Sequence, residues 1–227
     1  MTKIAIFYHC RLSGGDPPIQ LDHAIDVMSE QMAALIRSGL YPASTEMHVG
    51  VNGGAQDALV AGSILHAAGM DSANLMQHPD EFRGEHPTLF FMKQWAETHP
   101  DWMVFYHHIK GACHAGNETW AAWRRCMENA LVWRWQRCIM DLSDNSIEAA
   151  GTHWMTPERH PGIVAVPNFA GNFWWARSSL IKRLPPIAQT AVERLNFYDA
   201  EAWIGRANPR PLVVNYEWHW PGQNCIK

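Results

Sequence analysis

Two polar clusters, each following an apolar run, contain the side chains best suited to chemistry. The first cluster consists of His107, His108 and Lys110. These residues follow the almost wholly apolar residues 103–106 and come just before Gly111. Two imidazoles and an ammonium can move protons or neutralise an anion. The apolar run is typical of a strand that is buried on both faces. In open α/β sheets ligands bind beyond the carboxyl ends of such strands, so this cluster lies where a site is expected.

The second cluster follows the apolar residues 163–166, which we predict to be a strand. It contains Asn168, Asn172, Trp174 and Trp175. Amides both donate to and accept from hydroxyls, and an indole face can stack on the apolar face of a pyranose, so these four residues are candidates for sugar binding. The alternative is a packed aromatic corner that includes one of the two indoles.

Glu201 is a third candidate. It lies in the predicted short helix 199–205, between Ala200 and Ala202. Small neighbours allow a carboxylate to project into a cleft without obstruction. The alternative is a surface carboxylate or one that pairs two helices.

The elements that must position these residues alternate between strand and helix. Strands are predicted at 3–8, 47–51, 73–76 and 103–106, with helices at 22–38, 59–68 and 87–99 between them. This alternation is typical of a parallel sheet with helices on its faces. A long helix is expected from Asn117 to Cys138, a helix at 178–184, and a strand or extended tail at 215–221. We therefore predict one α/β domain over residues 1–227, with a central, mostly parallel sheet flanked by helices.

Composition and missing motifs exclude several classes of protein. With 47% hydrophobic and 18% charged residues the chain is globular, and its net charge of −4 gives no basic surface for a nucleic acid, which stays a possible but unsupported partner. GxGxxG and GxxxxGK[ST] are both missing, which disfavours a Rossmann dehydrogenase and a P-loop enzyme. The 13 histidines show no HExxH pattern, so a metal-dependent hydrolase is also disfavoured.

Location is predicted from the cysteines and the apolar runs. The five cysteines form no CxxC pair, and their odd number suits reduced thiols in a cytosol better than a secreted disulfide framework. No apolar run approaches the roughly 18 residues needed to span a bilayer. We therefore expect a cytoplasmic protein without a membrane span.

Three stretches together resemble a group of bacterial and viral glycosyltransferase-like proteins. Residues 106–111 read Y-H-H-I-K-G, residues 171–177 read G-N-F-W-W-A-R, and residues 200–205 read A-E-A-W-I-G. The pattern of the group is roughly Y-x-H-T-K-G, G-N-F-W-W-A and E-x-W-[IL], and Ile109 stands where threonine is usual. The order and spacing of the blocks fit over most of the chain. The resemblance implies a nucleotide-sugar-dependent transferase with a GT-A-like fold, which is related to the Rossmann fold.

The resemblance also implies roles for the residues. In GT-A-like folds the first strand and its loop hold the nucleotide, which makes Tyr8, His9 and Arg11 candidates for donor contact. An Asp-x-Asp usually holds a divalent metal at the end of a central strand. Here that strand ends in His107-His108-Ile109-Lys110 instead. A fixed ammonium can stabilise a leaving diphosphate as a metal does, so we expect Lys110, with His108, to replace the metal.

Other assignments come from the residues themselves. His107 remains open between a core role and donor contact, because adjacent residues on a strand point to opposite faces. No metal ligand is assigned, although a metal site could be built from Asp141, Asp144 or other histidines. If transfer is inverting, Glu201 is the candidate general base. The expected acceptor is a hydroxyl on a glycan, a lipid-linked glycan, a small molecule or a modified base.

A different class of function stays open, namely a non-catalytic module that binds carbohydrate or nucleotide. The lack of Asp-x-Asp favours it. Removing Lys110 or Glu201 discriminates the two, because a transferase loses turnover whereas a binding module loses only affinity.

Overall fold

The structure is a computed structural model that describes residues 2–15, 18–78, 84–187 and 199–214. The predicted strand or tail at 215–221 lies outside the described residues. None of the helices in the described part of the chain has the length and apolar character that crossing a bilayer requires.

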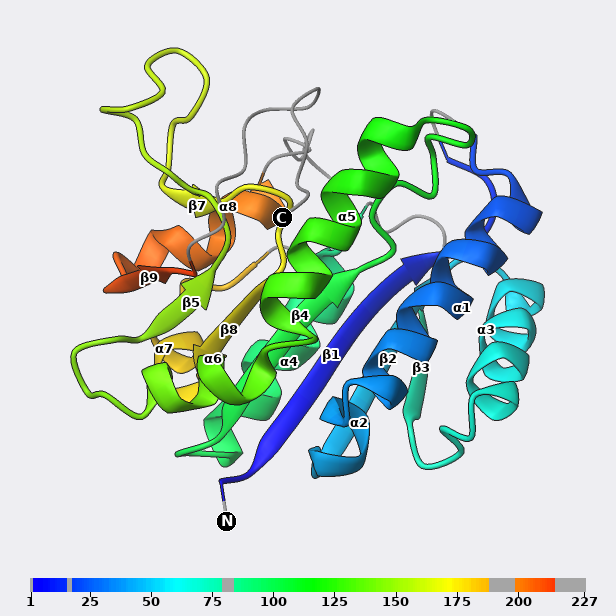
Figure 1. The fold of residues 1–227 in the computed structure, drawn as a ribbon, viewed down its shortest axis with the longest axis horizontal. Helices are drawn as coiled ribbons and strands as arrows, with labels where there is room; N and C mark the ends of the chain where they lie inside the picture. Colours follow the sequence, from blue (N-terminus) through cyan, green and yellow to red (C-terminus); the bar gives the residue numbers. More distant parts are fainter. Residues whose placement is uncertain (1, 16–17, 79–83, 188–198, 215–227) are drawn as a thin grey trace.

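A seven-stranded sheet forms the centre of the fold (Figure 1), in the order β3 (Asn74–His78), β2 (Glu46–Asn52), β1 (Ile4–Arg11), β4 (Met103–His108), β8 (Trp174–Arg177), β5 (Ala149–Gly151) and β9 (Pro211–Val213). The first four strands are parallel, β8 is antiparallel to both of its neighbours, and β9 is parallel to β5. A separate antiparallel pair consists of β6 (Trp154–Met155) and β7 (Asn168–Phe169). The predicted single α/β domain with a mostly parallel sheet is therefore confirmed.

Helices cover both faces of this sheet (Figure 1). On one face lie α1 (Leu21–Arg37), α3 (Ala55–Ala67), α5 (Glu118–Leu131) and α6 (Trp135–Leu142), with the short α2 (Leu40–Ala43) after α1. The other face carries α4 (His86–Thr98), α7 (Ser178–Arg183), α8 (Asp199–Ala202) and the 3₁₀-helix η1 (Trp203–Ala207).

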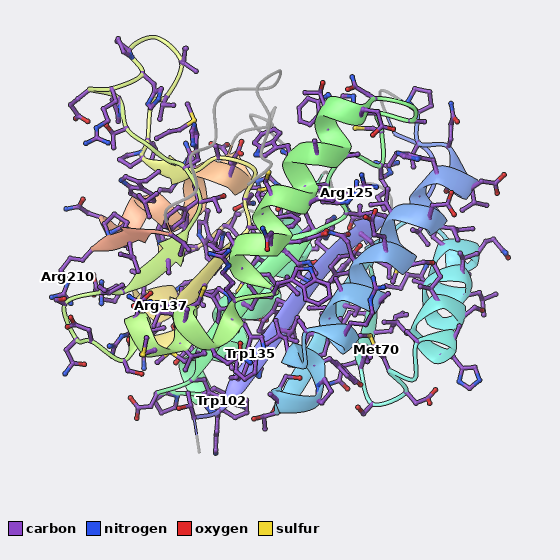
Figure 2. All side chains as sticks on the ribbon, in the orientation of Figure 1. Met70, Trp102, Arg125, Trp135, Arg137 and Arg210 are labelled. Carbon is purple, nitrogen blue, oxygen red and sulfur yellow. The ribbon has the colours of Figure 1, made fainter. Side chains whose placement is uncertain are left out.

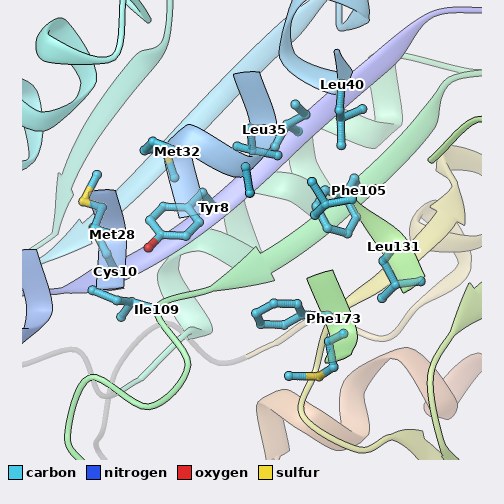
Figure 3. Packing of buried hydrophobic residues seen from close by; sticks show 14 of the residues in the cluster. Tyr8, Cys10, Met28, Met32, Leu35, Leu40, Phe105, Ile109, Leu131 and Phe173 are labelled. Atoms are coloured by element: carbon cyan, nitrogen blue, oxygen red, sulfur yellow. The ribbon is translucent and has the colours of Figure 1, made fainter. Parts of the chain in front are cut away.

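Alternate residues of the central strands pack on opposite faces, as the pleat requires. Figure 3 shows Tyr8 of β1 beside Met28 and Met32 of α1, and Phe105 of β4 lies in the same cluster. Phe7 packs in the cluster on the other face, with the residues of α4. Burial of each large apolar side chain contributes about 1.5–3 kcal/mol, so both faces hold the sheet in place.

The direction of chain growth changes between β1 and β4. The chain adds β2 and β3 on one side of β1 and then returns to place β4 on the other side. The loops that follow β1 and β4 both lead to helices on the same face of the sheet, and a small crevice lies between these two loops at the carboxyl ends of the strands. His9 and His108 are register partners at this point. The fold thus brings the first polar cluster of the sequence to the topological switch point.

Two predicted elements differ from the structure. The long helix expected from Asn117 to Cys138 is broken between α5 and α6, where Trp135 Nε1 donates to the Ser38 carbonyl (3.1 Å) and directs α6 toward the end of α1 (Figure 2). The strand expected at 163–166 is a turn. Gly162 has φ +77°, and the amides of Ile163 and Val164 both donate to the His160 carbonyl. These local bonds compete with a sheet ladder.

The cysteines correct a further expectation. Cys10, Cys113 and Cys138 are free thiols, whereas Cys126 is disulfide-bonded, so the prediction that every thiol is reduced is wrong for Cys126. The fifth cysteine, Cys225, lies outside the described residues.

Candidate functional site

Two buried side chains hold the backbone at the end of β4 by hydrogen bonds to its carbonyl oxygens. Gln31 of α1 donates to the His108 carbonyl (3.1 Å), and Arg124 of α5 donates to the Lys110 carbonyl (3.1 Å). Tyr8 in turn donates to Gln31 Oε1 (2.8 Å). Arg124 is only 3% exposed, and its guanidinium pairs with the Glu30 carboxylate (2.5 Å). The backbone from His108 to Lys110 is therefore fixed by both flanking helices.

Lys110 is a largely desolvated cation. Its ammonium lies over the indoles of Trp120 and Trp123, at 5.3 and 4.2 Å from the ring centroids. Burial lowers the pKa of Lys110, and the carboxylates of Glu201 and Glu85 oppose that shift. Cation–π contact and two nearby carboxylates both favour the charged form. The indoles thus hold a positive charge at the carboxyl end of β4, next to two negative ones.

His108 makes one clear hydrogen bond. Its Nε2 lies 3.0 Å from the Gly171 carbonyl oxygen, and since that oxygen only accepts, the ring proton is on Nε2. Burial lowers the pKa of His108, an effect that the Glu85 carboxylate partly offsets. The neutral ring therefore leaves Nδ1 as an acceptor, and Nδ1 lies 3.8 Å from Glu85 Oε1.

Glu85, just before α4, is the site residue that our sequence analysis missed. Its Oε2 accepts from the Tyr106 hydroxyl and from Asn172 Nδ2 (2.6 Å). Tyr106 and His108 are two residues apart on β4 and so share a face of the strand, which explains why one carboxylate meets both. Its position in the sequence was a possible signal. Pro87 marks the start of a helix, and acidic residues such as Glu85 are favoured just before and within the first turn of a helix.

Glu201 contacts the loop before β8 at the same site. Its Oε1 accepts the Gly171 N–H at 2.5 Å. Gly171 has φ +88°, and a Cβ atom there would lie 2.5 Å from Met127 Sδ, so the position requires glycine on both counts. His108, Gly171 and Glu201, which come from three separate stretches of sequence, are joined by two hydrogen bonds.

The second polar cluster is only partly a site. Trp174 and Trp175 are 1% and 0% exposed, so no ligand can stack on either indole, and their predicted sugar contact is corrected. Trp174 Nε1 donates to Asn172 Oδ1 (2.8 Å), and Trp175 Nε1 donates to the Leu131 carbonyl (2.9 Å). The physical reason is that β8 is an interior strand with core on both faces. Asn172 is buried and supports Glu85 instead of meeting a ligand.

Two of the predicted donor-binding residues are also core. Tyr8 is fully buried. His107 is 1% exposed and stacks on Phe105 (4.8 Å between centroids), and neither of its ring nitrogens has a hydrogen-bond partner among the described residues. Burial lowers the pKa of His107 to about 3. Direct donor contact by Tyr8 and His107 is therefore corrected, because β1 and β4 are central strands at these positions.

The remaining predicted residues lie at the end of β1 and in β7. His9 is 4% exposed, its Nδ1 lies 2.8 Å from Thr88 Oγ1, and burial holds its pKa well below the usual range. Arg11 is half-buried, and its Nε donates to the Ser13 carbonyl (3.0 Å). Asn168 is half-buried in β7 and donates to the Val166 carbonyl (3.0 Å). Arg11 is thus the residue of the first strand best placed to reach a ligand.

A cavity of about 250 Å³ lies between the loops that follow β1 and β4. Pro18 and Gln20 line it from the first loop, and residues 112–115 and 117 line it from the second. A larger groove of about 510 Å³ between α1 and α3 is lined by apolar and neutral polar residues and offers no titratable group. Among the described residues no three histidine, cysteine or acidic side chains are grouped to hold a metal ion. The chemistry is therefore concentrated at the ends of β1 and β4.

Comparison with known proteins identifies a family and finds matches among solved structures. The model of the family described as "Domain of unknown function (DUF8361)" matches residues 7–207. A comparison with curated proteins finds no match. The crystal structure of Rv0371c from Mycobacterium tuberculosis H37Rv is 14% identical over 81% of this chain and 77% of that chain, with a TM-score of 0.38. A likeness of that degree carries no further conclusion.

Proposed function

The chain belongs to the DUF8361 family, and we propose that it is a glycosyltransferase that moves a sugar from a nucleotide-sugar donor to a hydroxyl acceptor. One observation carries the proposal. The three blocks on which the resemblance rests meet in one place, where His108 donates to Gly171 and Gly171 donates to Glu201. Residues scattered over the sequence gain this proximity only through the fold, so it supports a common role.

Lys110 supplies the charge that such a reaction needs. Glycosyl transfer expels a nucleoside diphosphate, and the negative charge that develops on its leaving oxygen must be stabilised. The ammonium over Trp120 and Trp123 is fixed in place and shielded from water, which strengthens its effect on a neighbouring anion. Arg11, at the end of β1, is proposed to contact the donor from the other side of the crevice.

A divalent metal has no assigned role in this proposal. In this proposal the ammonium of Lys110 takes the place of the metal ion. The proposed acceptor remains a hydroxyl on a glycan, a lipid-linked glycan, a small molecule or a modified base.

The test is turnover of a panel of nucleoside diphosphate sugars, scored by released nucleoside diphosphate, with and without EDTA. Wild type is compared with Lys110→Ala and with Lys182→Ala, a control that removes an exposed lysine on α7. We expect release that resists EDTA, falls about 100-fold or more in Lys110→Ala and is unchanged in Lys182→Ala.

Two results would contradict the proposal. Release abolished by EDTA would overturn the replacement of a metal by Lys110. Donor binding without turnover in wild type, with Lys110→Ala losing affinity alone, would favour the non-catalytic binding module.

A further inference from the structure

Two acceptor atoms face one another in the site, and none of the residues that the structure describes is shown to place a donor between them. His108 uses its ring proton at Nε2 to bond the Gly171 carbonyl, so Nδ1 presents a lone pair. Glu85 Oε1, which lies 3.8 Å away, belongs to a carboxylate and also only accepts. Two acceptors cannot bond to each other, and the distance between them exceeds a hydrogen bond. The pair therefore suits a third group that brings a proton.

The surrounding contacts hold both acceptors in position. Tyr106 and Asn172 donate to Oε2 of Glu85, which leaves Oε1 to face the imidazole. Phe173 packs edge-on against the His108 ring, at 5.4 Å between centroids. Burial keeps His108 neutral at pH 7, as a proton acceptor must be. The arrangement is thus rigid before any ligand arrives.

On the basis of the proposed function, we infer that the acceptor hydroxyl binds beside both His108 Nδ1 and Glu85 Oε1, that its one proton is shared between these two acceptors, and that His108 takes this proton. The hydroxyl O–H bond breaks and its proton goes to Nδ1. The hydroxyl oxygen forms the new bond to the anomeric carbon. The bond from that carbon to the diphosphate oxygen breaks, and its electron pair leaves with the diphosphate next to Lys110. The Glu85 carboxylate stabilises the imidazolium that results.

Glu201 then has a different role from the base that the sequence suggested. Its Oε1 accepts a hydrogen bond from the Gly171 N–H, and the Gly171 carbonyl accepts one from His108 Nε2. That bond fixes which ring nitrogen carries the proton, as a partner of the other nitrogen does in catalytic histidines. Glu201 is therefore a positioning residue, and His108 is the catalytic base.

The experiment uses Glu85→Gln in the full chain. The remaining carbonyl oxygen of glutamine can keep the bonds from Tyr106 and Asn172, while its amide donates to Nδ1 and blocks it. Glu97→Gln, a change on the exposed part of α4, is the matched control. The measurements are kcat for sugar transfer against pH and donor affinity by calorimetry.

We expect Glu85→Gln to lower kcat about 100-fold or more with donor affinity unchanged. We also expect its acid limb to move to lower pH, because loss of the carboxylate lowers the pKa of His108 further. A purely structural role would leave the pH profile in place. The inference would be overturned if Glu85→Gln left both kcat and the pH profile unchanged. It would also be overturned if Glu85→Gln only weakened donor binding and kept the wild-type kcat at saturating donor.

A second measurement separates this inference from the proposed function. Nitrogen-15 NMR of His108 in wild type reports the tautomer without any substrate, and a proton on Nδ1 in place of Nε2 would overturn the inference alone. If wild type binds and turns over no donor, the proposed function fails. The inference, which rests on it, then fails whatever the tautomer.

Discussion

His108 and Glu201 are joined through a single residue, Gly171, whose carbonyl accepts from His108 Nε2 (3.0 Å) while its N–H donates to Glu201 Oε1 (2.5 Å). A shift of Gly171 must therefore move both the proposed base and the carboxylate that positions it.

Gly171→Ala should destabilise the protein by about 3 kcal/mol, since it adds positive-φ strain to a clash. The new Cβ would lie 2.5 Å from Met127 Sδ and 3.1 Å from Trp123 Cζ2. Gly162→Ala is the control, because Gly162 has φ +77° but no atom within 4 Å of the added Cβ, and it should cost about 1 kcal/mol. Urea unfolding of the two variants measures the difference, and equal losses would show that the clash is relieved.

Glu201→Gln and Glu201→Ala should differ in activity. Glutamine can still accept the Gly171 N–H, so we expect its kcat to stay within about tenfold of wild type, whereas alanine removes the bond and should cost about 100-fold. If Glu201 were the general base, both variants would lose activity equally, because the amide of glutamine does not take a proton. Transfer kinetics at saturating donor separate the two roles.

His107 should make the protein less stable in acid. Its pKa is 6.5 when unfolded and about 3 when folded, so between these values the unfolded chain binds more protons and stability falls as pH falls. From pH 8 to pH 5 the loss that is due to His107 should be about 2 kcal/mol. His107→Leu, which buries no unpaired nitrogen, should lose about that much less over the same range.

Urea unfolding at both pH values tests this prediction. His66→Gln is the control, because the fully exposed His66 has a raised pKa and so cannot produce this loss. A His107→Leu variant whose stability falls as steeply as that of wild type would show that His107 is solvated or paired.

Local signals in the sequence predicted most of the sheet and one wall of the site. The apolar runs that form β1 and β4 end in polar residues, and parallel strands bring those ends together, so the proximity of His9 and His108 followed from the sequence. The run at 163–166 has the same composition but sits between Gly162 and Pro167, which close it into a turn. Composition alone does not separate the two cases.

The parts of the site that the sequence did not reveal depend on distant contacts. Glu85 has no local motif, and only its bonds to Tyr106 and Asn172 draw it into the site. Trp174 and Trp175 resembled a ligand platform because interior strands lack the alternation that marks one face as exposed. Residues of α5 cover one face of β8 and residues of η1 cover the other, and both elements are distant from β8 in the sequence.

The entry of β8 into the sheet directly after Asn172 has a consequence for attempts to change specificity. Tyr106 of β4 pairs in register with Trp174, the first residue of β8. One side of the site is therefore formed by the beginning of a strand that belongs to the core. Randomising residues there would be expected to yield mostly insoluble protein. Libraries aimed at new acceptors should instead vary residues 113–117 and 156–163, which lie in loops and are not part of the buried hydrophobic core.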